Sequence, residues 1–201
     1  MIETIRAAND HPVALKDRRA LYESIPPRQV ACEIGVANGY NAEAIYQVCN
    51  PRELHLIDLW ANRQDVPRWA DITDVKHRQA LAQCQKRFAD SIREGRVFLH
   101  QGRSVPILQS FSVHYFDFAY VDGDHTYQGT LNDLRQCARV VHPGGFIAGH
   151  DYVSAATSKW AASGQYGVVE AVRDFTAKSD WKLIAVTQEK FPSFLLAIRG
   201  Q

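Results

Sequence analysis

The sequence predicts an α/β fold: a Rossmann-like, doubly wound sheet of seven strands, mainly parallel and ending in an antiparallel hairpin. Two observations lead to this prediction. Short apolar segments alternate with segments of helical periodicity, and only seven residues separate the last two apolar segments. Residues 1–201 are expected to form one domain, because no linker, repeat or low-complexity tract interrupts this pattern.

Five apolar segments are short and almost free of polar residues, as is typical of strands covered on both faces. They are Val30 to Ile34, Leu54 to Ile57, Val97 to Leu99, Phe116 to Val121 and Phe146 to Ala148. The last two strands, Trp181 to Val186 and Phe194 to Ile198, leave no room for a crossover helix between them. Since parallel neighbours need a dozen or more connecting residues, this pair should form a hairpin.

Helices are predicted between the strands from apolar residues spaced three and four apart. One such stripe is Tyr127, Leu131, Leu134, Ala138 and Val141, and the segment from His142 to Gly145 should stop this helix and turn into the next strand. A second is Leu81, Cys84, Phe88 and Ile92, in one longer helix that Gly95 ends. Residues Val168 to Ala177 form the last predicted helix.

Charge and composition exclude several partner classes. The 23 basic and 22 acidic residues give a net charge of +1, so no nucleic-acid or membrane partner is expected. The first residues lack the apolar core of a signal peptide, and the four cysteines form no C-x-x-C pair. We therefore expect a cytoplasmic protein with reduced cysteines, for which a homodimer is one option.

The most informative segment runs from Val30 through Glu33-Ile34-Gly35-Val36-Ala37-Asn38-Gly39. The two glycines allow a sharp turn close to a ligand, but Ala37 breaks the G-x-G-x-x-G pattern of diphosphate cradles. Glu33 lies in an apolar strand, where a carboxylate needs a partner. A cationic ligand would be such a partner. Alternatively, Glu33 pairs with an arginine or caps a loop.

Acidic residues and histidines end three further strands. Asp58 ends the second strand, where a carboxylate can accept both hydroxyls of a ribose. The fourth strand delivers Asp122-Gly123-Asp124-His125 and the fifth Gly149-His150-Asp151, and these ends should meet at one crevice. Oxygen and imidazole ligands suit a divalent ion such as Mg, Mn, Fe or Zn. Alternatively, Asp124 caps the following helix and His125 is a packed, hydrogen-bonded residue.

With these motifs the chain resembles the class I S-adenosylmethionine-dependent methyltransferases, especially a small subgroup with a D-G-D-H segment after the fourth strand. The C-terminal hairpin also fits that family. The resemblance implies S-adenosylmethionine as cofactor, with Asp58 on its ribose. It further implies that the methionine portion binds Glu33, Gly35 and Gly39 and that the adenine lies beside Gly102, Arg103 and Ser104. Asn38, in the same turn, is a further expected cofactor contact.

The metal-dependent small O-methyltransferases are similar at the reaction centre. This resemblance implies metal ligands at Asp122, His150 and Asp151, although Tyr152 stands where the catechol-type enzymes have asparagine. It also places His125 where related enzymes carry a lysine base, so His125 and Asp122 are the expected catalytic residues. The expected reaction is O-methylation of a small-molecule hydroxyl, with or without a metal.

Two other functions remain open on the sequence alone: a metal-dependent oxygenase or hydrolase on the same scaffold, and a non-catalytic cofactor-binding module. Two segments that follow strands, Trp60 to Asp74 and Tyr152 to Tyr166, are candidate substrate lids. They combine aromatic and basic residues, including Arg63, Arg68, Trp69, Lys159 and Trp160.

Overall fold

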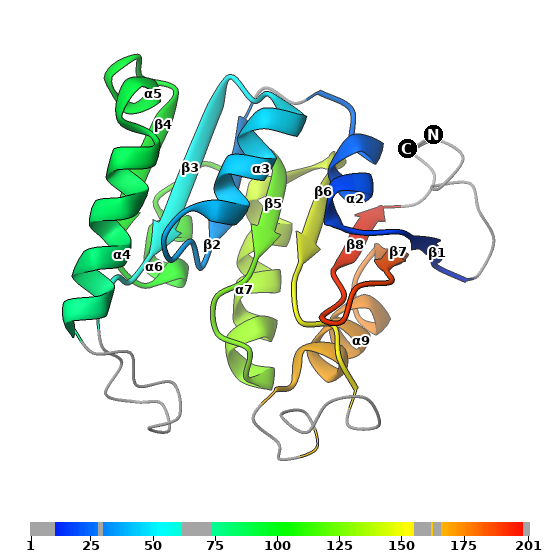
Figure 1. The fold of residues 1–201 in the computed structure, drawn as a ribbon. Coiled ribbons are helices and arrows are strands. Elements are labelled where there is room, and N and C mark those ends of the chain that lie inside the picture. Colours follow the sequence, from blue (N-terminus) through cyan, green and yellow to red (C-terminus); the bar gives the residue numbers. More distant parts are fainter. Residues whose placement is uncertain (1–10, 28–29, 62–73, 155–161, 163–165, 199–201) are drawn as a thin grey trace.

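A computed structural model describes residues 11–27, 30–61, 74–154, 162 and 166–198 (Figure 1). In chain order its elements are β1 (Val13–Leu15), α2 (Arg18–Ser24), β2 (Val30–Ile34), α3 (Tyr40–Cys49), β3 (Glu53–Asp58), α4 (Asp74–Arg87), α5 (Ala89–Arg93), β4 (Val97–Gln101), α6 (Ser104–Gln109), β5 (Phe116–Val121), α7 (Tyr127–Val140), β6 (Val141–Gly149), α9 (Val168–Ala177), β7 (Trp181–Thr187) and β8 (Phe194–Ile198).

The sheet confirms the predicted topology but has one strand more than expected. Its order is β1-β7-β8-β6-β5-β2-β3-β4, and all neighbours are parallel except β8, which is antiparallel to both β6 and β7. The predicted terminal hairpin is therefore present. The count of seven was wrong because β1 has only three residues, too few for a periodic pattern, and its pairing with β7 defines it.

Strand order reverses between β2 and β5, and this reversal positions the site. The chain runs outward from β2 through β3 to β4, then returns to β5 on the other side of β2. In an open parallel sheet, ligands bind beyond the carboxyl ends of the strands at such a switch point. The ends of β2 and β5 are joined there, since the Asp122 N–H donates to the Ile34 carbonyl at 2.7 Å.

Helices cover both faces of the sheet (Figure 1). On one face, apolar residues of α2, α3 and α4 pack on the sheet, among them Leu21, Ile45 and Cys84. On the other face α6, α7 and α9 contribute Leu108, Leu134 and Val172. This two-sided cover explains why the central strands are almost wholly apolar, and all four cysteines are buried and unpaired within these layers.

Three predicted boundaries differ from the structure. The helix predicted around Leu81 to Ile92 is divided at Phe88, which is buried and packs edge-on against Tyr46. In α7, Leu131 and Leu134 are buried as expected, but Tyr127 is 37% exposed. Strand β6 begins at Val141 rather than Phe146, because Val141 pairs with Phe116 before the register shifts.

An aromatic cluster surrounds His55 on β3. The His55 ring stacks on Phe98 and His100, with ring centroids 4.8 and 5.2 Å away, and its Nδ1 lies 2.9 Å from His100 Nε2. One of these nitrogens must donate and the other accept, so this contact requires at least the accepting imidazole to be neutral. Burial is the main cause that lowers the pKa of His55 to about 4, and the neighbouring His100 is the second.

The His55 cluster predicts a loss of stability in acid. Because the folded-state pKa lies below the ordinary imidazole value of 6.5, the unfolded chain takes up this proton first, and stability falls as the pH drops from 6.5 towards 4. The full loss at this site is about 3 kcal/mol. Urea unfolding at several pH values should therefore show a flatter profile in this range for His55→Phe than for the parent chain. The exposed His114→Asn should retain the parent profile, and a His55→Phe profile as steep as the parent's would contradict the assignment.

No helix in the described part of the chain combines the length and the apolar character needed to cross a membrane.

Candidate active site

A cavity of about 730 Å³ lies at the carboxyl edge of the sheet, where strand order reverses. Seven of the residues predicted for the site line it: Gly35, Asp58, Gly102, Arg103, Ser104, Asp122 and His125. The described lining does not include the other five, which are Glu33, Asn38, Gly39, His150 and Asp151. One cavity thus brings together the ends of four strands, β2, β3, β4 and β5.

The glycine turn after β2 is shaped by the backbone of the neighbouring strand. Gly35 has φ +85°, and a Cβ on it would lie 2.0 Å from the carbonyl oxygen of Asp122. The sequence analysis explained this glycine by the close approach of a ligand to the turn. The structure shows that close approach of the β5 end already requires it.

Asp58 holds the glycine turn and the segment after β3 through its side chain. Its Oδ2 accepts the Ala37 N–H at 2.9 Å, and its Oδ1 accepts the Trp60 N–H at 2.7 Å. The Trp60 indole N–H donates to the Ala37 carbonyl, and Trp60 is buried, so it belongs to this turn and not to a lid. A carboxylate has about four acceptor positions, which leaves Asp58 able to accept further donors from a ligand in the cavity.

Glu33 is completely buried behind the glycine turn. Its Oε1 accepts from the Asn41 side-chain amide at 2.8 Å, while no hydrogen bond reaches its Oε2 within the described structure. Burial raises the pKa of Glu33 well above its usual value, and nearby Asp122 and Asp58 raise it further. Glu33 and Asp58, which were predicted to share one pocket mouth, interact electrostatically, but of the two only Asp58 lines the cavity.

The turn from Gly102 to Ser104 lines the cavity at the end of β4 and begins α6. The Ser104 hydroxyl donates to Asp133 Oδ1 at 2.5 Å. Asp133 was not predicted as a site residue. It is almost fully buried in α7 yet lines the cavity, and nothing in the helical pattern distinguishes it from a surface acid.

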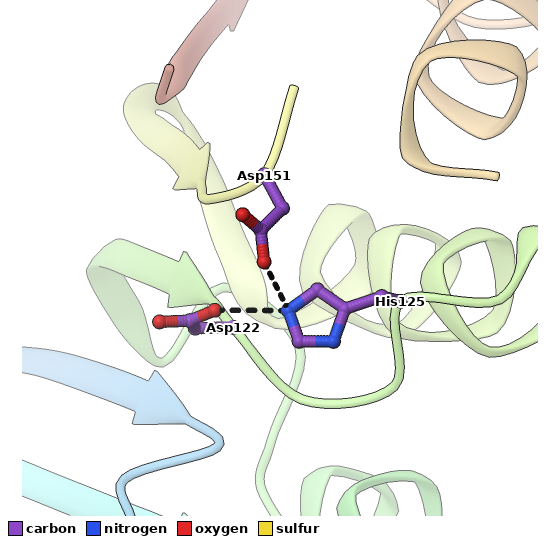
Figure 2. Close-up of side chains that lie close together, drawn as sticks. All are labelled: Asp122, His125 and Asp151. Atoms are coloured by element: carbon purple, nitrogen blue, oxygen red, sulfur yellow. Dashed lines mark hydrogen bonds and ion pairs between the residues drawn. The ribbon is translucent and has the colours of Figure 1, made fainter. Parts of the chain in front are cut away.

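Two carboxylates and one imidazole converge beside this cavity (Figure 2). His125 Nε2 lies 3.2 Å from Asp122 Oδ1 and 2.8 Å from Asp151 Oδ2. One donor atom from each of these three residues lies within 4.8 Å of the others, a spacing at which the group could hold a metal ion. The sequence analysis expected His150 in this set and His125 outside it.

His150 lies at the margin of the same cluster. Its Nδ1 is 3.5 Å from Asp122 Oδ1 and 3.6 Å from Asp151 Oδ1, longer than the His125 contacts. Asp151 adopts φ +52°, and its side chain approaches His125 more closely than it approaches the adjacent His150.

The two carboxylates determine the protonation of both histidines. Burial alone would lower the pKa of each imidazole, but the hydrogen bonds that the rings donate to Asp122 and Asp151 raise the pKa of His125 to about 10 and that of His150 to about 9. Burial would likewise raise the pKa of Asp151, but its bonds from the two histidines hold it well below its usual range. At neutral pH, His125 of the metal-free chain is therefore an imidazolium with both ring nitrogens protonated, and it is not poised to act as a base.

Asp124 takes part in starting α7, as the sequence analysis had left open. Its Oδ1 accepts the Thr126 N–H at 3.0 Å, and Thr126 is itself the N-cap, accepting from Gly129. Asp124 also lines the cavity, so the local structural contact does not remove it from the site.

Sequence reasoning placed Tyr166 only at the end of a candidate lid, whereas in the structure it stacks on His125 with ring centroids 4.8 Å apart. Burial is the main cause that raises the pKa of the Tyr166 hydroxyl, and the negative charges of Asp151 and Asp122 raise it further. The N–H of Gly167 donates to the His125 carbonyl at 2.8 Å, which fixes this aromatic residue at the reaction centre. No motif or period marks Tyr166. Six residues of the two predicted lids lie outside the described residues: Arg63, Asp65, Arg68, Trp69, Lys159 and Trp160.

Comparison with known proteins identifies the family. A family model described as a methyltransferase domain matches residues 32–152, more than half of the chain and the span from β2 to the end of β6. The chain belongs to this methyltransferase family. A sequence search of curated proteins gave no match.

Solved structures share the fold of this methyltransferase at low sequence identity. A candidate rRNA methylase from Clostridium thermocellum superposes with a TM-score of 0.65 at 12% identity, covering 93% of this chain and 98% of that one. An S-adenosylhomocysteine-bound methyltransferase from Podospora anserina gives 0.62 at 15%, covering 91% and 78%. An O-methyltransferase from neocarzinostatin biosynthesis, in complex with S-adenosylmethionine and a naphthoic acid, gives 0.58 at 13%, covering 88% and 50%. These names range from an rRNA methylase to an O-methyltransferase in complex with a small aromatic acid, so the methyltransferase fold alone does not specify the acceptor.

Proposed function

We propose that the chain transfers the methyl group of S-adenosylmethionine to a hydroxyl of a small-molecule acceptor, assisted by a divalent metal ion. One observation carries this proposal. Gly35 and Asp58, two of the predicted cofactor contacts, line the same cavity as Asp122 and His125, the two expected catalytic residues. Such sharing is what methyl transfer needs, because alignment of donor and acceptor supplies much of the rate.

The cavity residues suit a cationic adenosine ligand. Asp58 has acceptor capacity for two ribose hydroxyls beyond its two backbone contacts. The unpartnered oxygen of Glu33 lies behind the same turn and would be satisfied by an ammonium group. Neither feature suits a diphosphate, which carries negative charge.

The donor set fits a divalent metal ion. Asp122, His125 and Asp151 would hold it, since two carboxylate oxygens and one imidazole nitrogen already point at one another. An ion bound there would lower the pKa of an acceptor hydroxyl and favour its deprotonation near neutral pH. His150 would then orient the two carboxylates from outside the ligand set, in keeping with its longer contacts.

Metal binding distinguishes this ligand set from the one predicted from the sequence. We expect one Mn²⁺ per chain by calorimetry, with His125→Gln weakening binding by about a hundredfold and His150→Gln by about tenfold. His142→Gln, which removes a histidine bonded to Asp117 near the start of β6, should leave the affinity unchanged. A larger loss for His150→Gln than for His125→Gln would restore the original assignment, and the absence of Mn²⁺ binding would argue for metal-free transfer.

The acceptor class can be tested with labelled S-adenosylmethionine. The nearly balanced charge of the chain favours a small molecule over a polyanion. Incubation with panels of phenols, catechols and sugars, with and without EDTA, should label an acceptor in a metal-dependent way. Label in an added RNA sample instead would contradict the acceptor class but keep the methyltransferase. No label, together with no calorimetric heat from S-adenosylhomocysteine, would contradict the whole proposal.

A further inference from the structure

The His125 ring is held by hydrogen bonds at one of its two nitrogens. Its contacts with Asp122 and Asp151 both involve Nε2, at 3.2 and 2.8 Å. Figure 2 shows the second ring nitrogen, Nδ1, pointing away from the two carboxylates. A metal-binding histidine is usually oriented by a hydrogen bond at the nitrogen opposite the metal. No described residue makes that bond to His125, so a different contact is needed to fix the plane of the ring.

The Tyr166 ring supplies such a contact. The two rings are stacked, with centroids 4.8 Å apart and an angle of 18° between their planes. Offset stacking at this distance is a favourable arrangement of aromatic rings. A stacked neighbour restricts rotation of the imidazole about its Cβ–Cγ bond, and that rotation would otherwise turn Nε2 of His125 away from the carboxylates.

The backbone holds Tyr166 in place over this ring. The N–H of Gly167, the next residue, donates to the His125 carbonyl at 2.8 Å. Gly167 is also the N-cap of α9, and a Cβ on it would lie 2.6 Å from the backbone nitrogen of Tyr127, the first residue of α7. The starts of α7 and α9 are therefore in close contact, and this contact sets the position of Tyr166 relative to His125.

We propose that Tyr166 is a positioning residue for the metal centre: its ring fixes the plane of the His125 imidazole, so that Nε2 faces Asp122 and Asp151 before an ion binds. An ion binds more tightly to a ligand that is already oriented, because less motion is lost on binding. This inference rests on the proposed metal-assisted function and adds a residue outside the ligand set. Tyr166 is not part of the described cavity lining, so its effect is exerted through His125.

Two substitutions at the same position test the inference. We expect Tyr166→Leu to weaken Mn²⁺ binding by about tenfold in titration calorimetry, the low end of the range for residues that orient a metal ligand. Tyr166→Phe keeps the ring and should bind Mn²⁺ within about twofold of the parent chain, since stacking does not need the hydroxyl. The matched control is Tyr115→Leu, which removes a tyrosine of the His55 cluster that does not line the cavity and should leave the affinity unchanged.

An NMR measurement on the metal-free chain separates positioning from general packing. The ring current of Tyr166 should displace the signals of the His125 ring protons. We expect Tyr166→Leu to abolish this displacement and Tyr166→Phe to retain it. A residue that served only to pack the start of α9 would change the urea midpoint and leave the Mn²⁺ affinity as it is in the parent chain.

Two results would overturn the inference alone: parent affinity in Tyr166→Leu, or equal weakening by Tyr166→Leu and Tyr166→Phe. If Tyr166→Leu does not fold, the parent chain provides the test with Mg²⁺, which is diamagnetic. Nuclear Overhauser contacts between the ring protons of His125 and Tyr166 should persist when Mg²⁺ binds, and their loss on binding would exclude positioning by the stack. A parent chain that binds neither Mn²⁺ nor Mg²⁺ would instead contradict the metal-assisted function on which the inference rests.

Discussion

Replacing Gly35 by alanine is expected to destabilise the protein by roughly 2–5 kcal/mol. Two costs add at this position. Alanine is strained at φ +85°, and its Cβ would lie 2.0 Å from the Asp122 carbonyl oxygen, which would force the ends of β2 and β5 apart. Urea unfolding monitored by circular dichroism measures the change as a lower midpoint.

Gly95→Ala is the matched control for this loss. Gly95 also has positive φ, +70°, but a Cβ at that position would meet no atom within 4 Å. Only the conformational cost applies, about 1–2 kcal/mol. Equal destabilisation by the two substitutions would show that the close approach of the two strand ends contributes nothing.

Replacing Asp58 by alanine is expected to weaken S-adenosylhomocysteine binding by at least about a hundredfold. Its carboxylate would accept two ribose hydroxyls, and each charge-assisted hydrogen bond is worth about 1.5–3 kcal/mol. The substitution also releases the Ala37 and Trp60 N–H groups that shape the turn. Titration calorimetry measures the change directly.

Asp90→Ala provides the comparison for Asp58→Ala. Asp90 is an exposed carboxylate paired with Arg93 on α5, it does not line the cavity, and its loss should leave the affinity unchanged. An Asp58→Ala variant that keeps parent affinity would remove the ribose contact from the proposed site.

Strand ends were predictable from the sequence, and this is why much of the candidate site could be found. Asp58 and Asp122 each follow a run of apolar residues, and parallel strands align their carboxyl ends whatever the details of the loops. The same reasoning located the hairpin, because seven residues exclude a parallel connection. Apolar pattern and connection length are local properties that one sequence contains.

Orientation within the site could not be predicted in the same way. Whether His125 or His150 approaches the carboxylates depends on loop backbone angles, such as φ +52° at Asp151, which residue spacing does not encode. The burial of Glu33 depends on which helix covers that face of β2, and the side chain meets Asn41 of α3 only in the folded chain. The three residues of β1 form a strand by pairing with β7, which lies more than 160 residues later in the sequence.

The connection between β6 and α9 is tied down at both of its ends. At the first end, the His150 N–H donates to the Val121 carbonyl and the Tyr152 N–H to that of Pro192. At the second end, the Gly167 N–H donates to His125 and Tyr166 stacks on its ring. Because both ends are held by contacts of described residues, exchanging residues between these two attachment points, or changing their number, should leave the carboxylate–imidazole geometry unchanged. The connection is therefore a position at which the chain should tolerate insertions without loss of the candidate site.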